Sequence, residues 1–363
     1  MRILHLTDHF PPVVGGIETH VAGLAERQAH QGHSVTVLTS TPRTAEGQTS
    51  TDVGPVEVRR VRSLLDGLRV DVHTFDLVHA HVSVVAPFTA PLVGVFARRG
   101  VPTVVTVHSL WSGMGAIPRV AATLTGMRGA PVTWSTVSRV AAAELRRHLL
   151  LGTPVHVIAN AVEAPARPRT PQPDGEVRLV STMRIARRKR PLELLRILDE
   201  VSRAVSVPGV SLTVVGDGPL RHRLEHRAVR LGLADRVRVT GRVAPTRVLR
   251  HLARSDVYVA PAVLESFGLA ALEARGVGLP VVGRTATGLA DFIDDGVEGL
   301  LCASDNDMVS ALVELVEDRH LRLRMSEHNR RVAHGMSWSR SLATHERVYA
   351  LARGRQYEAV LEP

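Results

Sequence analysis

The sequence is poor in cysteine, aromatic residues and lysine, and each scarcity narrows what the chain can be. Its single cysteine, Cys302, excludes an internal disulfide and a cysteine-based metal site, and it fits a cytoplasmic location. Aromatic residues make up 3% of the chain, too few for the stacking platforms that bind single-stranded nucleic acid. Lysine occurs once, at Lys189, and arginine supplies every other basic side chain among the 45 lysines and arginines.

Long apolar runs are also missing. The longest uncharged apolar stretch, Val82 to Ala97, contains two prolines and falls short of the ~20 residues that span a bilayer, so we expect a buried helix there. The N-terminal segment meets Asp8 and His9 too early for the apolar region of a signal peptide. These features predict a cytoplasmic protein and leave open a peripheral contact with the inner face of the membrane.

The remaining composition is typical of a folded globular protein. Hydrophobic residues make up 44% of the chain and charged residues 22%, and 363 residues are about twice the length of a usual single domain. The net charge of +10 would suit nucleic acid, a membrane surface or a phosphorylated substrate. Because the arginines are dispersed and lack interleaved aromatic residues, we expect no nucleic-acid partner.

Short runs of Val, Ile and Leu alternate with helical patterns almost throughout, which predicts βαβ units and parallel sheets. Four prolines crowd the segment around 165–175, which lacks apolar periodicity, so we expect a linker there. The sequence therefore predicts an α/β fold with two doubly wound Rossmann-like domains, residues 1–164 and 176–337. In such folds ligands bind at the carboxyl ends of the strands, and all the motifs described next follow predicted strands.

Paired glycines follow the first predicted strand. Gly15 and Gly16 precede an amphipathic helix, where exposed backbone N–H groups and the helix dipole favour an anion. The Gly-x-Gly-x-x-Gly pattern of dinucleotide-binding folds is absent, and a plain tight turn explains the two glycines equally well.

A basic segment, 184–190, follows the first predicted strand of the second domain. Fixed cations at a strand end could hold a diphosphate leaving group, and Arg184 and Lys189 are the candidates. A solvated basic surface is the alternative. The single lysine favours the specific contact, because an ammonium and a guanidinium differ in shape and hydration.

Two glutamates flank a predicted helix start. Glu265 lies just after a predicted strand, and Glu273 lies eight positions later, a spacing of about two helical turns that would bring both to one side. Carboxylates accept hydrogen bonds from paired hydroxyls, so the two would suit a hexose and a ribose. Between them, the backbone of four residues would open a helix and offer N–H donors to phosphate: Ser266, Phe267, Gly268 and Leu269. A helix cap and a surface acid are the alternatives.

With these motifs, the chain resembles the GT-B retaining glycosyltransferases, a family that includes bacterial phosphatidylinositol mannosyltransferases and the glycosyltransferase of mycothiol synthesis. The resemblance rests on the order of several elements along nearly the whole chain. They are Pro-x-x-x-Gly-Gly-x-Glu at 11–18, Gly32-His33, Val215-Gly216-Asp217-Gly218-Pro219, Glu265-x7-Glu273 and Gly278-x-Pro280-Val281-Val282. It implies a GT-B architecture in which the two domains face each other across a cleft, with the acceptor on the first and the nucleotide sugar on the second.

The resemblance also assigns roles to residues. It implies that Gly16, with Gly15 and Gly216, approaches the donor, and that His108 contacts the donor hexose. Arg184 and Lys189 would hold the diphosphate, Glu265 the sugar hydroxyls and Glu273 the ribose. Arg242 matches the place where backbone groups meet the base. The segment 338–363 is similar to the part of the family that crosses back to the first domain, and Leu342, Val348 and Leu351 would dock there.

The expected activity is transfer of a hexose from a UDP- or GDP-sugar to an unidentified acceptor hydroxyl, with retention at the anomeric carbon and without a cofactor. The acidic pair in Asp305-Asn306-Asp307 more plausibly caps a helix than binds metal, so no metal is expected. A sugar-nucleotide epimerase with the same fold is one alternative, and an arginine-rich nucleic-acid-binding protein is another.

Overall fold

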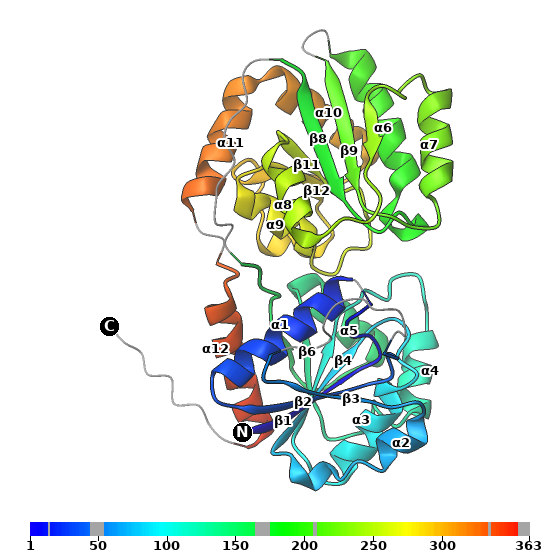
Figure 1. Cartoon of the computed structure of the whole chain (residues 1–363), viewed down its shortest axis with the longest axis vertical. Coiled ribbons are helices and arrows are strands. Elements are labelled where there is room, and N and C mark those ends of the chain that lie inside the picture. Colours follow the sequence, from blue (N-terminus) through cyan, green and yellow to red (C-terminus); the bar gives the residue numbers. More distant parts are fainter. Residues whose placement is uncertain (14, 44–53, 164–174, 206–208, 333–334, 355–363) are drawn as a thin grey trace. The chain divides into compact units, whose positions relative to one another are not determined.

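The computed structural model describes residues 1–13, 15–43, 54–163, 175–205, 209–332 and 335–354. The chain forms two compact units: unit 1 is Met1–Ala161 with the segment that begins at Trp338, and unit 2 is Val162–Ser337. Each unit has one parallel sheet with helices on both faces (Figure 1), so the predicted doubly wound architecture is confirmed. Of the predicted linker, residues 165–174 lie outside the described residues.

The sheet of unit 1 has the strand order β3-β2-β1-β4-β5-β6-β7, and every pair is parallel. Among the described residues, a helix lies between each pair of consecutive strands except β2 and β3, as parallel strands need crossover connections. The elements are β1 (Arg2–Thr7), α1 (Gly16–His30), β2 (Ser34–Thr39), β3 (Glu57–Arg60), α2 (Leu64–Leu68), η1 (Val72–Thr74), β4 (Leu77–Val82), α3 (Thr89–Arg98), β5 (Thr103–Val107), α4 (Ile117–Leu124), β6 (Thr133–Thr136), α5 (Arg139–Leu149), β7 (Val155–Val157) and α12 (Trp338–Ala352).

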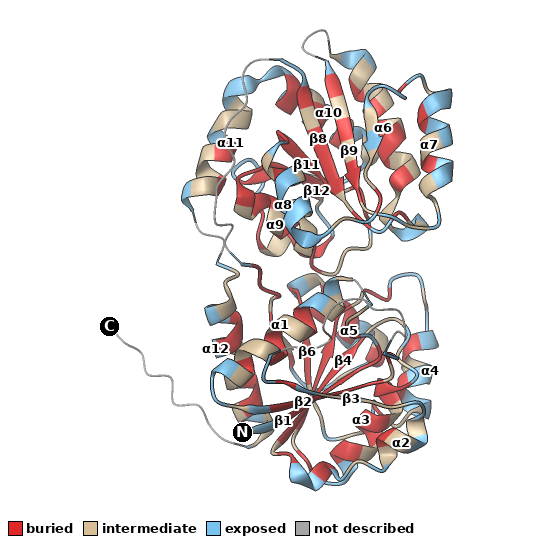
Figure 2. Ribbon diagram, in the orientation of Figure 1, coloured by how far each residue is buried: buried red, intermediate tan, exposed pale blue. Residues whose placement is uncertain are grey.

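The sheet of unit 2 has the strand order β10-β9-β8-β11-β12-β13. Its strands are also parallel throughout, and the inner strands β8, β11 and β12 are mostly buried (Figure 2), in keeping with their valine-rich sequences. The elements are β8 (Val177–Thr182), η2 (Arg187–Lys189), α6 (Pro191–Ala204), β9 (Val210–Val215), α7 (Arg221–Arg230), β10 (Val237–Val239), α8 (Pro245–Ala253), β11 (Val257–Val259), α9 (Leu269–Val277), β12 (Val281–Arg284), η3 (Gly288–Asp291), β13 (Gly299–Cys302), α10 (Asp305–Glu317) and α11 (Arg319–Arg331).

The strand order reverses once in each sheet, between β1 and β4 in unit 1 and between β8 and β11 in unit 2. Loops that leave the two strands at such a point diverge to opposite faces, and this leaves a crevice at the carboxyl end of the sheet. In unit 1 the Asp8 carboxylate spans that point and accepts hydrogen bonds from the backbone N–H groups of Phe88 at 2.9 Å and Thr89 at 3.2 Å. By this rule, the fold predicts one ligand-binding crevice on each unit, where its strand order reverses.

Helix α12 packs on the sheet of unit 1. Leu342 and Val348 are buried and Tyr349 is fully buried, whereas Leu351 is exposed, so Leu351 was wrongly predicted to dock. The stretch Val82 to Ala97 is also not one helix: Val82 ends β4, and α3 begins only at Thr89. Among the described residues, we find no helix with the length and hydropathy needed to cross a membrane.

Candidate functional site

The crevice of unit 2 brings Lys189 and Glu265 together. Lys189 ends η2 in the loop after β8, and Glu265 lies in the loop after β11, so the two flank the point where the strand order reverses. The Lys189 ammonium forms an ion pair with the Glu265 carboxylate, and the two side chains are 34% and 20% exposed. A cation and a carboxylate thus lie at one accessible place, although 76 positions separate them in the sequence.

Arg190 holds the loop that carries Lys189. Its backbone adopts a left-handed conformation with φ of 55°, and its guanidinium donates to both oxygens of Asp305 at 2.8 Å and to the Pro261 carbonyl at 3.0 Å. Arg196 donates to the same carboxylate at 2.8 Å. Hydrogen bonds from Arg190 are the main reason why the pKa of Asp305 falls to about 2. Arg190 therefore ties the loops after β8 and β11 to the start of α10.

Asp305 consequently does more than the sequence indicated. The N-cap of α10 is Ser304, which forms a reciprocal capping box with Asp307. The helix-capping interpretation of Asp305-Asn306-Asp307 is thus correct for Asp307, while Asp305 accepts hydrogen bonds from Arg190 of the basic segment and from Arg196 of α6.

Arg184 is exposed on the same loop, and its backbone is fixed by the loop after β9. The flanking residue Met183 donates to the Val215 carbonyl at 3.0 Å, and Ile185 donates to the Asp217 carbonyl at 2.9 Å. Gly216 makes this contact possible, since a Cβ atom there would lie 2.0 Å from the Met183 carbonyl oxygen, and its φ is +141°. Gly216 therefore shapes the loop that presents Arg184.

Helix α9 starts at Leu269, so the segment between the two glutamates is not helical throughout. Gly268, with φ of 100°, is the N-cap, and Glu265 lies in the preceding loop, so the helical spacing argument for the two glutamates was wrong. Both carboxylates nevertheless lie near the Tyr258 hydroxyl, whose pKa rises mainly because of burial and also because of their charges. Burial also raises the pKa of Glu273 to about 7.

The other residues at this helix start contribute backbone more than side chain. Phe267 is buried, and its ring lies 5.3 Å from that of Phe292. Ser266 is partly buried, and its carbonyl oxygen would lie 2.2 Å from a Cβ atom at Gly288, so the two loops touch. The first turn of a helix presents N–H groups without intrahelical partners, which suits an anion.

Arg242 is exposed at the neighbouring edge of unit 2. It follows Gly241, which pairs with Gly216 in an isolated bridge, so the loops after β9 and β10 lie side by side. A base could lie along this edge, with Arg242 accessible beside it.

In unit 1, His108 follows β5 and is 5% exposed. Its Nε2 lies 3.0 Å from Nδ1 of His81, and burial lowers its pKa to about 3, so the ring is neutral at physiological pH. Gly15 and Gly16 open α1; Gly15 is the N-cap, with extended backbone, and Gly16 is exposed. A Cβ atom at Gly15 would lie 2.2 Å from the Glu18 carboxylate, which is the end of a flexible side chain and could move aside.

Sequence reasoning missed a buried histidine cluster in unit 1. Among the described residues, His5, His79 and His81 form one group whose ring nitrogens lie within 4.8 Å of one another. The signal was His-x-His in β4, since residues two apart in a strand point to the same face.

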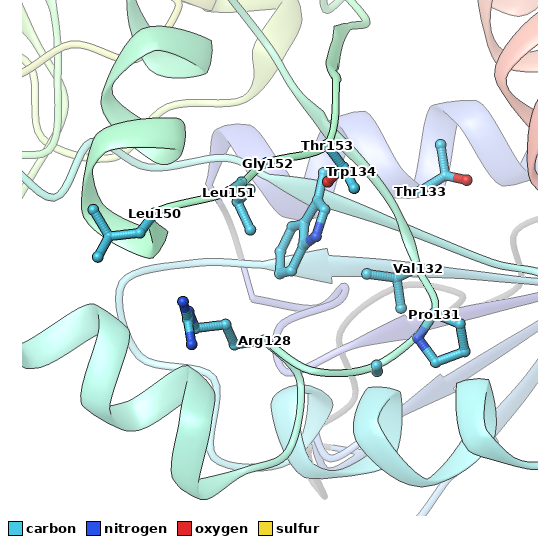
Figure 3. A pocket seen from close by; sticks show the side chains of 10 residues that line it. Arg128, Pro131, Val132, Thr133, Trp134, Leu150, Leu151, Gly152 and Thr153 are labelled. Atoms are coloured by element: carbon cyan, nitrogen blue, oxygen red, sulfur yellow. The ribbon is translucent and has the colours of Figure 1, made fainter.

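A cavity of about 440 Å³ lies elsewhere in unit 1, around Trp134 and Leu151 (Figure 3). Its residues Val132 and Thr133 lie at the amino end of β6, whereas His108 and the glycines follow carboxyl ends of strands. The cavity is therefore separate from the predicted site.

Comparison with known proteins identifies relatives over the whole chain. Residues 163–332 match the family described as "Glycosyl transferases group 1", and residues 14–164 match "Glycosyltransferase Family 4". The D-inositol 3-phosphate glycosyltransferase of Frankia alni is 31% identical over 96% of this chain and 95% of its own length. Glycogen synthase of Mycobacterium tuberculosis H37Rv is 27% identical over 97% of this chain and 95% of its own. Among solved structures, Anabaena HepE in complex with UDP and glucose superposes with a TM-score of 0.73 at 18% identity, over 98% of this chain and 100% of its own.

Proposed function

Because the chain belongs to the group 1 glycosyltransferases of the GT-B class, we propose that it is a retaining enzyme that moves a hexose from a UDP- or GDP-sugar to an acceptor hydroxyl. The observation that carries this proposal is the pairing of Lys189 with Glu265 where the strand order of unit 2 reverses. One group suits a diphosphate and the other suits sugar hydroxyls.

In the absence of donor, the two charges satisfy each other. When a nucleotide sugar binds, its diphosphate competes for the Lys189 ammonium and its hydroxyls compete for the Glu265 carboxylate. Arg184, held exposed by the Gly216 contact, adds a second cation. The N-terminus of α9 adds backbone N–H groups. The leaving diphosphate gains negative charge as the glycosidic bond breaks, so these groups stabilise the transition state more than the ground state.

We take retention from the resemblance to the retaining GT-B glycosyltransferases, and the two candidate carboxylates of unit 2 bear on how it is achieved. Glu265 is ion-paired and Glu273 is partly buried with a raised pKa, so neither is a good nucleophile toward an anomeric carbon. We favour substitution on one face, in which the departing diphosphate takes the proton of the acceptor hydroxyl. Lys189, Arg184 and the helix N-terminus supply the positive charge, so no metal ion is required for the step.

The test is transfer from UDP- and GDP-hexoses to a panel of acceptor hydroxyl compounds, with EDTA present and with NMR assignment of the product anomer. The proposal predicts an axial or equatorial linkage identical to that of the donor, and unchanged rates in EDTA. An inverted product would refute retention, and lost turnover on chelation would refute metal independence. An epimerase would instead release an altered nucleotide sugar with no bond to the acceptor, a result that membership of this family does not favour.

We also propose that helix α4 of unit 1 makes a peripheral contact with an anionic membrane. Ile117, Val120 and Leu124 of this helix are 64%, 52% and 83% exposed. Helix α5 packs against α4 and exposes Arg146 and Arg147, and Glu144, the one acid between Leu77 and Val162, is buried. An apolar stripe on a basic surface is typical of helices that lie in the membrane interface.

Sedimentation with vesicles tests this contact. We expect binding to vesicles of phosphatidylcholine with phosphatidylglycerol, weaker binding to phosphatidylcholine alone, and loss of binding in Leu124→Asp. Val229→Asp is the matched control, because Val229 is 64% exposed on α7 of unit 2. Equal binding by both variants would contradict a role for α4.

A further inference from the structure

A chain of hydrogen bonds runs through the interior of unit 1 and ends at His108. The Oε1 atom of Gln28 lies 2.8 Å from Nε2 of His5, Nδ1 of His5 lies 2.9 Å from Nε2 of His81, and Nδ1 of His81 lies 3.0 Å from Nε2 of His108. Gln28 and His5 are 0% exposed, and His81 is 3% exposed. The chain therefore links helix α1, two central strands and the loop after β5 without a bridging water.

The other end of Gln28 continues the chain in a second direction. Its Nε2 donates to the Tyr349 hydroxyl at 3.0 Å, and that hydroxyl lies 2.8 Å from Nδ1 of His79. Nε2 of His79 lies 2.7 Å from the Thr106 hydroxyl, which lies 2.6 Å from the Ser135 hydroxyl. Ser135 donates to the backbone carbonyl of Val105 at 3.2 Å, and a carbonyl can only accept.

The Val105 carbonyl determines which atom donates in each hydrogen bond between Gln28 and Ser135. Each hydroxyl has one proton, so Ser135, which donates to Val105, accepts from Thr106, and Thr106 in turn accepts from Nε2 of His79. Nδ1 of His79 is then an acceptor for Tyr349, and Tyr349 accepts from the Gln28 amide nitrogen. The orientation of the Gln28 amide follows, with its oxygen toward His5.

The orientation of the Gln28 amide in turn determines which atom donates in each hydrogen bond between Gln28 and His108. A neutral imidazole has one donor and one acceptor nitrogen, so a contact between two ring nitrogens needs one of each. His5 donates from Nε2 to Gln28 and therefore accepts at Nδ1 from His81. His81 then accepts at Nδ1 from His108. We propose that Gln28, through His5 and His81, is a positioning residue that fixes His108 as the tautomer with its proton on Nε2 and an acceptor at Nδ1.

The chain works only if its histidines are neutral, and burial makes them so. Burial is the main cause of the low pKa of His5, at about 4, and of His108, at about 3, and it lowers the pKa of His79 and His81 well below the usual value. A buried metal ion at His5, His79 and His81 is the competing interpretation. It would need ring lone pairs that here point at other hydrogen-bond partners.

The consequence for activity rests on the proposed function and on the role that the family resemblance implies for His108, which is contact with the donor hexose. A sugar hydroxyl that meets Nδ1 must donate its proton, so the enzyme selects a hydroxyl orientation before reaction. In enzymes with a catalytic triad, holding the histidine in the wrong tautomer removes most of the turnover rate although the position of the ring is unchanged. Here one hydrogen bond is at stake, so we expect a loss of about tenfold in kcat/KM when the tautomer is released.

The test measures the tautomer directly on the full chain. Histidine labelled with ¹⁵N distinguishes protonated from unprotonated ring nitrogens by NMR, and the spectrum of His108→Gln identifies the His108 signals. Three variants are compared with the wild type at pH 7. Gln28→Leu keeps the volume but removes both polar ends. Gln28→Glu keeps an acceptor toward His5. His345→Gln is the control. His345 lies in the same buried cluster, 5.5 Å from the His79 ring, but its hydrogen bond goes to the Ser341 carbonyl, which is not part of the hydrogen-bonded series from Gln28 to His108.

We expect His108 to carry its proton on Nε2 in the wild type, in Gln28→Glu and in His345→Gln, and to become a mixture of tautomers in Gln28→Leu with the tenfold loss in kcat/KM. A proton on Nδ1 in the wild type would overturn the proposal without any variant. So would an unchanged tautomer in Gln28→Leu, or a stoichiometric metal ion in the purified protein. If the tautomers are as expected but no sugar is transferred from any nucleotide sugar, the proposed function fails and the positioning role of Gln28 stands.

Discussion

Replacement of Lys189 by arginine tests the crevice of unit 2 most sharply, because charge is kept and only shape changes. A compact ammonium on a flexible stem can leave Glu265 and meet a phosphate oxygen as a point charge. A guanidinium would bind the same carboxylate through two parallel charge-assisted hydrogen bonds, and such bonds are roughly twice as strong as hydrogen bonds between neutral groups. Arginine at this position would therefore hold Glu265 against the incoming sugar and present a wider group to the diphosphate.

The exposure of the pair separates the effect on stability from the effect on catalysis. Side chains that are 34% and 20% exposed make an ion pair of about 0.2–1 kcal/mol, so Lys189→Arg should change the free energy of unfolding by less than about 1 kcal/mol. Turnover should fall at least ~10-fold, equivalent to about 1.4 kcal/mol of transition-state stabilisation. Release of nucleoside diphosphate gives kcat and KM, and thermal melting checks the fold.

The structure also selects the control. Arg190, one step along the basic segment, is bonded to Asp305 and to the Pro261 carbonyl, so Arg190→Ala is expected to lower the melting temperature and cannot serve. Arg187 is exposed at the start of the same short helix, and Arg187→Ala should leave turnover nearly unchanged. If Lys189→Ala and Arg187→Ala have equally small effects at unchanged melting temperature, the basic segment is only a solvated surface and our reasoning is wrong.

Three further outcomes are expected. The pKa of Glu273 is raised from the usual 4.5 to about 7, so the folded protein binds the proton of this carboxyl more tightly than the unfolded protein does. The free energy of unfolding should therefore fall by up to about 3 kcal/mol as the pH rises from 4.5 to 7. Urea titrations should show this fall in the wild type and not in Glu273→Gln. Gly216→Ala should cost about 1–3 kcal/mol more than Gly232→Ala by the same titrations, because both positions have positive φ but a Cβ atom meets nothing within 4 Å at Gly232. Calorimetry in EDTA should show the free nucleoside diphosphate binding almost as tightly as the sugar nucleotide, and loss of binding on chelation would contradict this.

The architecture was predictable from the sequence because it rests on local patterns. Runs such as Thr103–Val107 are rich in valine and buried throughout, as expected of a central strand covered on both faces, and such runs alternate with amphipathic helices. The start of α3 was not predictable from the sequence. The loop between β4 and α3 is as rich in apolar residues as the helix itself, although it is not helical. Periodicity cannot separate a buried loop from a buried helix.

For the candidate site, the positions of the residues after strands were predictable, whereas their contacts were not. Position after a strand was enough to select Lys189 and Glu265, but their pairing depends on the order in which β8 and β11 meet in the sheet. The role of Asp305 depends on a left-handed residue, Arg190, that turns its guanidinium toward α10. The buried chain through Gln28 joins elements as distant as α1 and α12, and no local sequence pattern encodes such a contact.

The two crevices differ in their electrostatics, and this difference bears on the pH dependence of turnover. A transferred sugar develops positive charge near its anomeric carbon, as in other glycosyl transfers, so a protonated histidine beside it would oppose the reaction. Burial keeps the pKa of His108 at about 3, and the ring therefore stays neutral through the whole range in which the protein is assayed. Burial raises the pKa of Glu273, by contrast, to about 7. A titration in turnover between pH 6 and 8 would therefore report this carboxylate, which is predicted to bind the ribose, or the acceptor, and Glu273→Gln distinguishes these two sources.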